Sequence, residues 1–227
     1  MSEKSLRKIQ SFVRRSGRLS TGQKTGLNEL WSSYGIDLPT GKLELNACFA
    51  IQQPIVLEIG FGNGDSLLEM ALNTPEKNFL GVEVYEAGVG RIINEANKHR
   101  LTNLKIIKDD AVEVLKHHIH DDSFDTFQLF FPDPWHKKKH HKRRIVQAEF
   151  LDLISKKLKP GATVHMATDW EDYAYHMMEV LENHTHFKNT MDAHNYALRP
   201  KHRPITKFER RGERLGHGVW DLIFTKE

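Results

Sequence analysis

From Ile55 onward, the chain alternates between short apolar runs and stretches in which apolar residues recur at helical spacing. The apolar runs predict strands over 55–60, 78–85, 104–111, 124–131, 162–169 and 219–226. The helical spacing between them predicts helices over 66–74, 87–100, 111–119, 145–161 and 171–183. Strands that alternate with helices in this way form βαβ units. We therefore expect an α/β protein built on a mostly parallel sheet.

Residues 1–50 have weaker periodicity and are rich in Ser, Gly, Arg and Lys. They predict a basic N-terminal arm and extension, followed by one domain over 51–227. In parallel sheets of this kind, ligands bind at the carboxyl ends of the strands. The sequence motifs that carry chemistry all follow predicted strands, so we expect them to meet at one edge.

The first such motif, EIGFGNGD (58–65), joins the first predicted strand to the first helix. Its glycines allow a ligand to approach the backbone closely. The spacing is G-x-G-x-G, and Asp65 stands where a dinucleotide fingerprint needs its third glycine. Together with Glu58, Asp65 favours a ligand with a cationic amine over one with two phosphates. A tight turn that binds nothing would have the same glycines.

Acidic residues also end the next two predicted strands. Glu83 lies about 20 residues after the glycine loop, where a carboxylate can accept hydrogen bonds from both hydroxyls of a ribose. Asp109, Asp110 and Ala111 end the third strand, where a carboxylate can accept from an adenine amino group beside a small residue. Each acid alone is typical of a solvated strand end. Together they favour S-adenosylmethionine over NAD or no ligand.

The fourth predicted strand runs into FFPDPWHKKKHHKRR (130–144). The prolines on either side of Asp133 restrict the backbone, so this carboxylate is held at the edge of the sheet. Trp135 offers a flat surface for packing or base stacking. The following nine residues are all Lys, Arg or His, which is typical either of a solvated loop or of a surface that binds nucleic-acid phosphates. Their place beside a predicted active site favours nucleic acid.

Composition and charge distribution indicate which partners and which compartment the protein is suited to. The net charge is only +3, but basic residues concentrate at 4–24, 137–144 and 199–214, which favours a polyanionic partner. The hydrophobic fraction is 39%, and no apolar run is long enough to cross a membrane. The chain has a single cysteine, Cys48, and its start lacks an apolar signal segment. These features predict a cytoplasmic protein without membrane association. The fourteen histidines have no Cys or carboxylate ligand set beside them, so exposed or RNA-facing histidines are favoured over a metal site.

Six segments, in order, resemble the motifs of the bacterial tRNA (guanine-N7-)-methyltransferase family: VLEIGFGNG, GVEVY, DDA, FPDPWHKKKHHKRRIV, ATDWEDYA and ITKFERRGERLGH. The segment SFVRRSGRLSTGQ is similar to that family's N-terminal region, so the resemblance covers nearly the whole chain. It implies a class I S-adenosylmethionine-dependent methyltransferase. The implied fold is Rossmann-like and doubly wound, with a seven-stranded sheet, an antiparallel last strand and helices on both faces.

The resemblance also implies roles for individual residues. S-adenosylmethionine would be bound by Glu58, Gly60, Gly62, Gly64, Glu83, Asp110, Ala111 and Asp133, and Asp133 would be the catalytic aspartate. The substrate nucleotide would be contacted by Lys137, Asp169, Thr206, Lys207, Phe208 and Glu209. The RNA backbone would be held by Lys138, Lys139, His140, His141, Lys142, Arg143 and Arg144. The implied partner is tRNA, with no obligatory protein partner, and the product is 7-methylguanosine at position 46 of the tRNA variable loop.

The chemistry fits these residues. Guanine N7 carries a free lone pair and the sulfonium methyl is already activated, so alignment of the reactants is the main requirement and no general base is needed. A fixed carboxylate would stabilise the positive charge that the purine gains, and Asp133, Asp169 and Glu209 are all candidates. Alternatives are a methyltransferase acting on a small molecule or protein, a non-catalytic RNA-binding module and, more distantly, a nicotinamide oxidoreductase.

Overall fold

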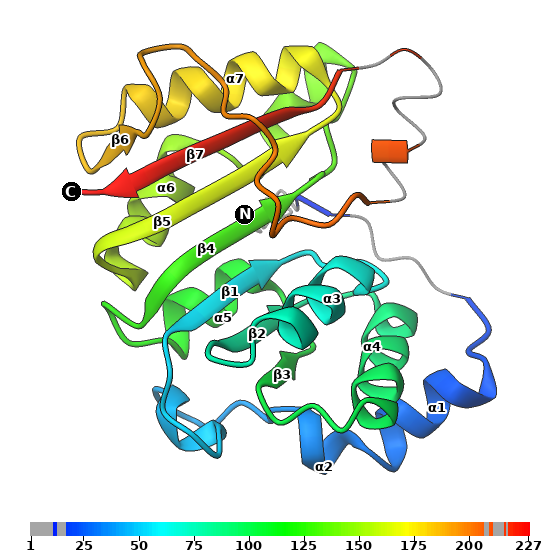
Figure 1. Ribbon diagram of the computed structural model, residues 1–227. Helices are drawn as coiled ribbons and strands as arrows, with labels where there is room; N and C mark the ends of the chain where they lie inside the picture. Colours follow the sequence, from blue (N-terminus) through cyan, green and yellow to red (C-terminus); the bar gives the residue numbers. More distant parts are fainter. Residues whose placement is uncertain (1–10, 13–16, 207–208, 211–215, 217) are drawn as a thin grey trace, which may run out of the picture.

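The computed structural model describes residues 11–12, 17–206, 209–210, 216 and 218–227. Within these ranges the chain forms one seven-stranded sheet of order β3-β2-β1-β4-β5-β7-β6 (Figure 1). The strands are β1 (Ile55–Ile59), β2 (Asn78–Val82), β3 (Leu104–Ile107), β4 (Phe124–Phe130), β5 (Leu158–Thr168), β6 (Phe187–Asn189) and β7 (Trp220–Lys226). The longer helices are α1 (Thr21–Asn28), α3 (Asp65–Asn73), α4 (Glu86–Lys98), α5 (Ala111–His117), α6 (Ala148–Lys157) and α7 (Glu171–Glu182), and the short ones are α2 (Trp31–Tyr34), η1 (Leu45–Cys48) and η2 (Lys138–Arg143).

The pairing of the strands confirms the expected fold class. Strands β3, β2, β1, β4 and β5 are mutually parallel, and β7 runs antiparallel between β5 and β6. The carboxyl ends of β1, β2, β3 and β4 therefore lie along the same edge. The four motifs that follow these strands are brought together there.

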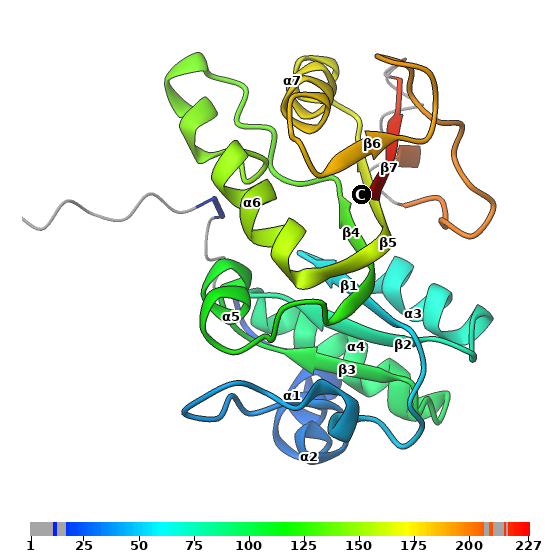
Figure 2. The ribbon, with the colours of Figure 1, turned by 90° about the vertical axis from the view of Figure 1, so that its left-hand side faces the viewer.

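Both faces of the sheet are covered (Figure 2). On β1, Ile55, Leu57 and Ile59 pack into the cluster that holds the apolar side chains of α5, α6 and α7. Val56, which points the other way, packs into the cluster formed with α3 and α4. This alternation follows from the side-chain period of two along a strand. All five positions of β1 are buried, as expected of a central strand in a doubly covered sheet.

The half of the sheet beyond β4 is covered differently. The segment 190–206, which links β6 toward β7, crosses in front of β7 and β5 (Figure 1). A bridge between Ala197 and Asp221 fixes part of it to β7. Thus an irregular segment covers the face of β5 and β7 that is opposite α6 and α7.

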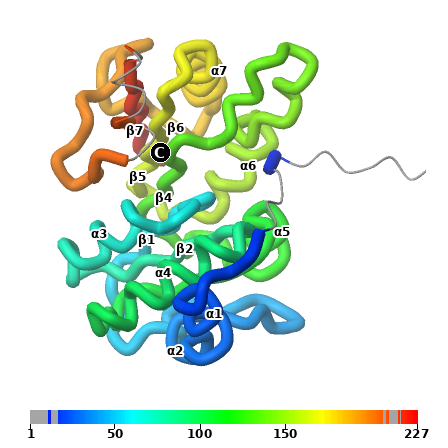
Figure 3. Tube along the Cα trace, turned by 90° about the vertical axis from the view of Figure 1, so that its right-hand side faces the viewer, coloured from blue at the N-terminus to red at the C-terminus, as the bar shows by residue number. Residues whose placement is uncertain are grey.

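Residues 21–49 pack on the same sheet and contribute buried side chains. Ile36 donates its backbone N–H to the carbonyl of Ile106 at 2.9 Å, and Phe49 is buried in the cluster of β1, β4 and β5. Helix α1 lies against α4 (Figure 3). Gly26 and Gly90 make this close approach possible, since a Cβ on Gly26 would come within 2.0 Å of the Gly90 carbonyl oxygen.

Three details differ from the sequence prediction. The helix predicted over 145–161 ends at Lys157, because Leu158 already pairs with Phe124 as the first residue of β5. The three-residue strand β6 was too short to leave a periodic signal. Phe131 does not continue the alternation of β4: its φ of 52° turns it toward the cluster that contains Phe130. No helix within the described residues is long and apolar enough to cross a membrane.

Candidate active site at the carboxyl edge of the sheet

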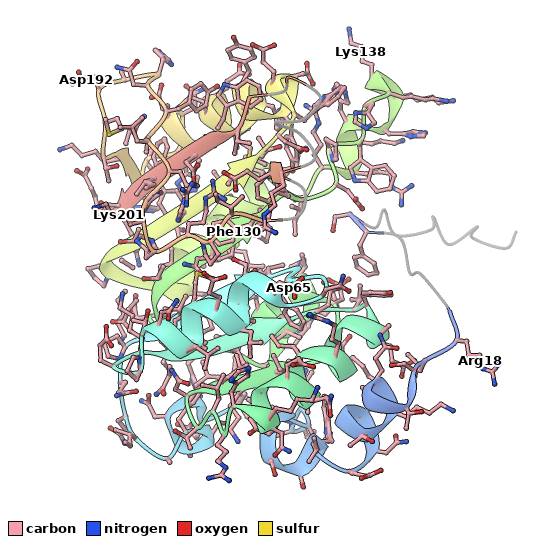
Figure 4. All side chains as sticks on the ribbon, turned by 45° about the vertical axis from the view of Figure 1, so that its right-hand side comes forward. Arg18, Asp65, Phe130, Lys138, Asp192 and Lys201 are labelled. Atoms are coloured by element: carbon pink, nitrogen blue, oxygen red, sulfur yellow. The ribbon has the colours of Figure 1, made fainter. Side chains whose placement is uncertain are left out.

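A cavity of about 950 Å³ opens at the carboxyl ends of β1, β2, β3 and β4. It is lined by every residue that the sequence assigns to the cofactor: Glu58, Gly60, Gly62, Gly64, Glu83, Asp110, Ala111 and Asp133. Phe130 lines it on the side of β4, and Asp65 lines it from the start of α3 (Figure 4). A volume of this size is typical of small-molecule and cofactor sites.

The glycine loop owes its shape to its residue types. Gly60, Gly62 and Gly64 have φ values of 73°, 58° and 77°, a region that side chains strongly disfavour. Apart from the adjoining residues, no described residue has an atom within 4 Å of a Cβ placed on Gly60 or Gly62, so the backbone here faces open space. At Gly64 a Cβ would lie 2.5 Å from Ile92, so this glycine also allows α3 to pack against α4.

Glu83 holds the glycine loop to the end of β2. Its Oε2 accepts from the Gly62 N–H at 2.8 Å, and its Oε1 accepts from the backbone N–H groups of Val84 at 2.6 Å and Tyr85 at 2.9 Å. A carboxylate oxygen has two lone pairs, so Glu83 retains acceptor capacity toward the cavity. It can therefore shape the loop and still accept from hydroxyl groups of a ligand.

Glu58 is the most unusual group in the cavity. Its side chain is 3% exposed, and its Oε2 has no hydrogen-bond partner among the described residues. Burial, followed by the neighbouring charge of Glu83, raises the pKa of Glu58 to about 8. An unpaired buried carboxyl group beside a glycine loop fits a ligand that brings a cation, such as an amino group.

Asp110 is the N-cap residue of α5 and lines the cavity after the end of β3. Its Oδ1 accepts from the Val112 N–H at 3.0 Å, the interaction of an N-cap residue. Asp109 accepts from the Asp110 N–H at 2.7 Å and is more exposed. Both acids line the cavity, and so does Ala111, the first residue of α5, whose small side chain leaves space for a ligand beside the acids.

Asp133 lies where β4 has left the sheet. Phe131 and Trp135, on either side of the Pro-Asp-Pro sequence, both have positive φ values, of 52° and 48°. The side chain of Asp133 is exposed and lines the cavity. The chain thus turns sharply on both sides of this aspartate and presents it between the cavity and the basic segment.

The basic tract forms the short helix η2 and the turns around it. Lys137, Lys138, Lys139 and Lys142 are exposed, and Lys138 points away from the body of the protein (Figure 4). His140, His141 and Arg143 are half-buried. The Arg143 guanidinium lies 3.7 Å from the centre of the Trp135 ring, so one face of this tryptophan is already covered.

Arg144 differs from the rest of the tract because it is buried. Its Nε donates to the Pro134 carbonyl at 3.0 Å, and its guanidinium pairs with Asp172 and lies 4.7 Å from the Tyr173 ring centre. The hydrogen bond from Arg144 lowers the pKa of Asp172. Here Arg144 ties the turn after Asp133 to α7 and does not present its charge to solvent, unlike the lysines predicted with it to hold RNA.

The residues predicted to contact the substrate nucleotide fall into three groups. Lys137 precedes η2, and Asp169 is half-buried at the end of β5; neither lines the cavity. Thr206 lines the cavity, while Glu209 is 3% exposed. Lys207 and Phe208 lie outside the described residues.

Thr206 and Glu209 bind each other. The Glu209 N–H donates to Thr206 Oγ1 at 3.1 Å, and the Thr206 N–H donates to Glu209 Oε2 at 3.4 Å. These are the reciprocal bonds of a capping box, which the spacing of Thr and Glu in T-K-F-E permits. The T-x-x-E spacing is enough to predict this helix start from the sequence.

Two further features were not predicted. Arg203 is buried and binds Glu209 and Asp221, although the sequence gives no sign that this arginine differs from its basic neighbours. Ser11 and Phe12 line the cavity from the arm, and the Ser11 carbonyl accepts from the Trp135 indole N–H at 3.2 Å.

Within the described ranges, no group of three or more His, Cys, Asp or Glu side chains is arranged to hold a metal ion.

Comparison with known proteins places this site in a family. A family model described as "Putative methyltransferase" matches residues 52–222. A protein of Psychromonas ingrahamii named tRNA (guanine-N(7)-)-methyltransferase is 55% identical over 223 residues, covering 98% of this chain and 91% of its own. A protein of the same name from Aeromonas hydrophila is 56% identical, covering 98% of this chain and 94% of its own.

Solved structures support the fold alone. The 16S rRNA methyltransferase KamB superimposes with a TM-score of 0.58 at 15% identity, covering 98% of this chain and all of its own. The aminoglycoside resistance methyltransferase NpmB1 gives 0.53 at 14% identity, covering 93% and 95%. The family model and the sequence relatives show that the chain is a methyltransferase and belongs to the tRNA (guanine-N7-)-methyltransferase family.

Proposed function

We propose that this protein transfers a methyl group from S-adenosylmethionine to N7 of guanine 46 in the variable loop of tRNA. The observation that carries the proposal is the convergence of the glycine loop, Glu58 and Asp133 on one cavity. The chain also matches relatives named for this activity along nearly its whole length. Residues 51–227 would form the cofactor-binding domain, with 1–50 as its arm and extension.

The cavity fits S-adenosylmethionine on two counts. The unpaired carboxyl group of Glu58 suits the cofactor's amino group, and the open backbone at Gly60 and Gly62 allows its close approach. Glu83 would accept from the ribose hydroxyls, and Asp110 beside Ala111 would accept from the adenine amino group. When bound, S-adenosylmethionine supplies a methyl group that its sulfonium has already activated.

The residues of the chain would then align the reactants. In a direct in-line displacement, the N7 lone pair forms the new N–C bond as the C–S bond breaks. No proton leaves N7, so no general base is required. Asp133 lies between the cavity and the basic tract, where its carboxylate would stabilise the positive charge on the methylated purine. A carboxylate, of Asp133 or of Asp169, would accept from guanine N1–H and N2–H₂, which adenine does not offer.

The tract at 137–143 would hold the tRNA. Lys138, Lys139, His140, His141, Lys142 and Arg143 follow directly after Asp133 and Trp135, so phosphate contacts there would bring the RNA to the cavity mouth. Lys137 would reach the nucleotide itself. Arg144, which is buried against Asp172, would support the turn and leave the phosphates to its neighbours.

The test uses labelled S-adenosylmethionine and unmodified tRNA with a guanine in the variable loop. Borohydride–aniline cleavage maps 7-methylguanosine, and we expect a single cut at position 46. Asp133→Ala should abolish turnover and leave tRNA affinity within about threefold, since Asp133 makes no phosphate contact. Asp192→Ala, which removes an exposed aspartate that does not line the cavity, is the matched control and should retain activity.

Other outcomes would indicate other functions. Cofactor binding without transfer to any RNA would favour a methyltransferase acting on a small molecule or protein. RNA binding without cofactor binding would favour a non-catalytic module. A large loss of tRNA affinity in Asp133→Ala would remove this residue from its catalytic role.

A further inference from the structure

Arg203 lies at the centre of a buried ionic network on the face of β5 and β7 that the segment 190–206 covers. Its side chain is 0% exposed. It donates to both oxygens of Glu209, at 2.7 and 3.1 Å, and to both oxygens of Asp221, at 2.7 and 2.9 Å. His165 on β5 lies 2.7 Å from Asp221 Oδ1. One guanidinium therefore joins the sheet to the segment that carries T-K-F-E.

The charges in this network depend on one another. Burial alone would raise the pKa of Asp221, but hydrogen bonds from His165 and Arg203 lower it. Burial would likewise lower the pKa of Arg203, but Glu209 and Asp221 raise it. Arg203 and Asp221 are thus stabilised in their charged forms, and removal of one leaves an uncompensated charge in the interior.

Stability alone does not explain such a network. Replacing a buried ion pair by well-packed apolar residues is often neutral or stabilising, because the cost of desolvation offsets the attraction. What a bidentate guanidinium adds is direction, since its planar donors fix both partners in one geometry. The network is therefore better suited to holding a segment in place than to stabilising the fold.

The segment that it holds forms a wall of the cavity. Pro204, Ile205 and Thr206 follow Arg203 directly and line the cavity, and Glu209 ends the same turn. Arg203 thus holds both ends of this turn: its backbone precedes the turn, and its guanidinium binds Glu209 at the other end. Its guanidinium also lies 5.9 and 5.7 Å from the ring centres of Phe130 and Phe131, which line the cavity from β4.

The same hydrogen bonds give Glu209 a different task from the one predicted. Both of its oxygens accept from Arg203, the side chain is buried, and Glu209 is not among the residues that line the cavity. Thr206 is half-buried at the cavity, and its hydroxyl oxygen accepts from the Glu209 N–H, so its own proton remains available to donate. The group that can face a substrate is Thr206, and Glu209 fixes it.

We propose that Arg203 is a positioning residue for methyl transfer: by binding Glu209 and Asp221 together, it fixes Thr206 against the cavity, and Glu209 acts through this clamp. This inference rests on the proposed function, because it assigns Thr206 to the nucleotide substrate. It adds a residue to the site that no motif marks, and it moves Glu209 from direct base contact to support.

The test compares Arg203→Lys, Glu209→Gln and the double variant in single-turnover transfer to tRNA, with cofactor affinity measured separately. Lysine keeps the charge and cannot bind both carboxylates in bidentate geometry. We expect the transfer rate at saturating tRNA to fall by about 10²-fold in Arg203→Lys, since small misplacements of a reacting group cost that much. Cofactor affinity should stay within about threefold, because Glu58 and Glu83 are untouched.

Non-additivity separates positioning from simple destabilisation. If Arg203 acts through Glu209, the double variant should be no slower than the more damaged single variant. Lys157→Met is the matched control. This buried lysine binds Asp121 and the Ile119 carbonyl at the opposite end of β5, so it should lower the melting temperature and leave the transfer rate unchanged. If Arg203→Lys does not fold, Asp221→Asn loosens the same clamp from the sheet and should give the same reduction in rate.

Each result decides between the possibilities. An Arg203→Lys or Asp221→Asn variant that is destabilised as Lys157→Met is, but transfers at the wild-type rate, overturns the inference. Rate reductions that multiply in the double variant also overturn it, since Glu209 would then act independently. A wild-type protein that binds cofactor and transfers nothing to tRNA would overturn the proposed function itself, and the inference with it.

Discussion

Glu58 shows how a single residue can link cofactor binding to pH. Its carboxyl group is buried at the end of β1, and burial raises its pKa to about 8. A cationic amino group would favour the ionised form, so the pKa should fall again when such a ligand binds. Near neutral pH, most Glu58 side chains in the free protein must then lose a proton before they can pair with the ligand.

We therefore predict that S-adenosylmethionine binds more weakly as pH falls, by about fivefold from pH 8 to pH 7. Isothermal titration at several pH values, in buffers of different ionisation enthalpy, measures both affinity and proton release. Glu58→Gln removes the protein's share of this dependence and retains that of the ligand's own amino group. Equal pH profiles for the two proteins would show that Glu58 is not the linked group.

The same shift affects the stability of the free protein. Because the folded state holds the Glu58 proton more tightly than the unfolded state does, this residue costs nothing below its ordinary pKa of 4.5, and stability falls as pH rises toward 8. Glu58→Gln should therefore raise the free energy of unfolding at pH 7, on the order of 3 kcal/mol. Urea unfolding at pH 4.5 and pH 7 measures it, and a gain equal at both pH values would contradict the mechanism.

At the level of single elements, the short helix η2 carries exposed lysines that can bind phosphate. Lys138 and Lys139 are exposed on this short helix and have no ion-pair partner among the described residues. Cations presented in this way release counterions when they bind phosphate, which makes RNA affinity depend on salt. The steepness of that salt dependence therefore reports how many phosphates the protein neutralises.

Replacing Lys138 and Lys139 by alanine should weaken tRNA binding and reduce the slope of log affinity against log salt, by about 0.7–0.9 for each phosphate that is no longer neutralised. Filter binding between low and high salt measures this slope. Lys188→Ala on β6 is the control, since it removes an exposed lysine from the edge strand of the sheet. A slope that matches wild type would place η2 outside the RNA interface.

The packing of α1 on α4 depends on two glycines. A Cβ on Gly90 would lie 2.2 Å from the Gln23 carbonyl oxygen, which is backbone and has no rotamer to change. Alanine normally favours a helix interior over glycine by roughly 0.5–1 kcal/mol. Here the steric cost should exceed that gain, because overfilling a packed interface costs roughly 1–3 kcal/mol.

We predict that Gly90→Ala lowers the free energy of unfolding and exposes the backbone of 21–34 to hydrogen exchange. Gly41→Ala is the control: in the part of the chain that the structure describes, no residue other than its chain neighbours has an atom within 4 Å of a Cβ there, so the change should be nearly neutral. Hydrogen exchange with mass spectrometry resolves both effects. Unaltered protection of α1 in Gly90→Ala would mean that the helix pair adjusts without separating.

For the molecule as a whole, the packing joins residues 21–49 to the sheet. Phe49 is 6% exposed and belongs to the same apolar cluster as the buried residues of β1, β4 and β5. Phe49→Ala should therefore lower the free energy of unfolding by about 3–5 kcal/mol, as truncation of a buried phenylalanine does. Denaturation followed by two independent probes tests this, and a decrease below about 1 kcal/mol would indicate a loosely attached extension.

The layout of the fold could be predicted because it follows from local pattern. Buried strands such as 55–59 are short apolar runs, in this one interrupted only by Glu58, and helices such as 86–98 have an apolar stripe. Their order alone therefore indicated a parallel sheet. The end of α6 could not be predicted, because Leu158 is suitable for either a helix or a strand and its pairing with Phe124 decides. Phe131 was predicted as the last residue of a strand over 124–131, but β4 ends at Phe130, and the positive φ that turns Phe131 out of the strand leaves no local pattern.

Which residue types meet at one edge of the sheet could be read from the sequence, because the ends of parallel strands are adjacent whatever the packing around them. The cavity accordingly contains every residue expected to bind the cofactor. How each charge is used follows from the folded structure alone. Arg144 and Arg203 are indistinguishable in sequence from their exposed basic neighbours, and yet both are buried against carboxylates from distant segments. Burial and ion pairing depend on interactions between residues far apart in the chain, and no local pattern records them.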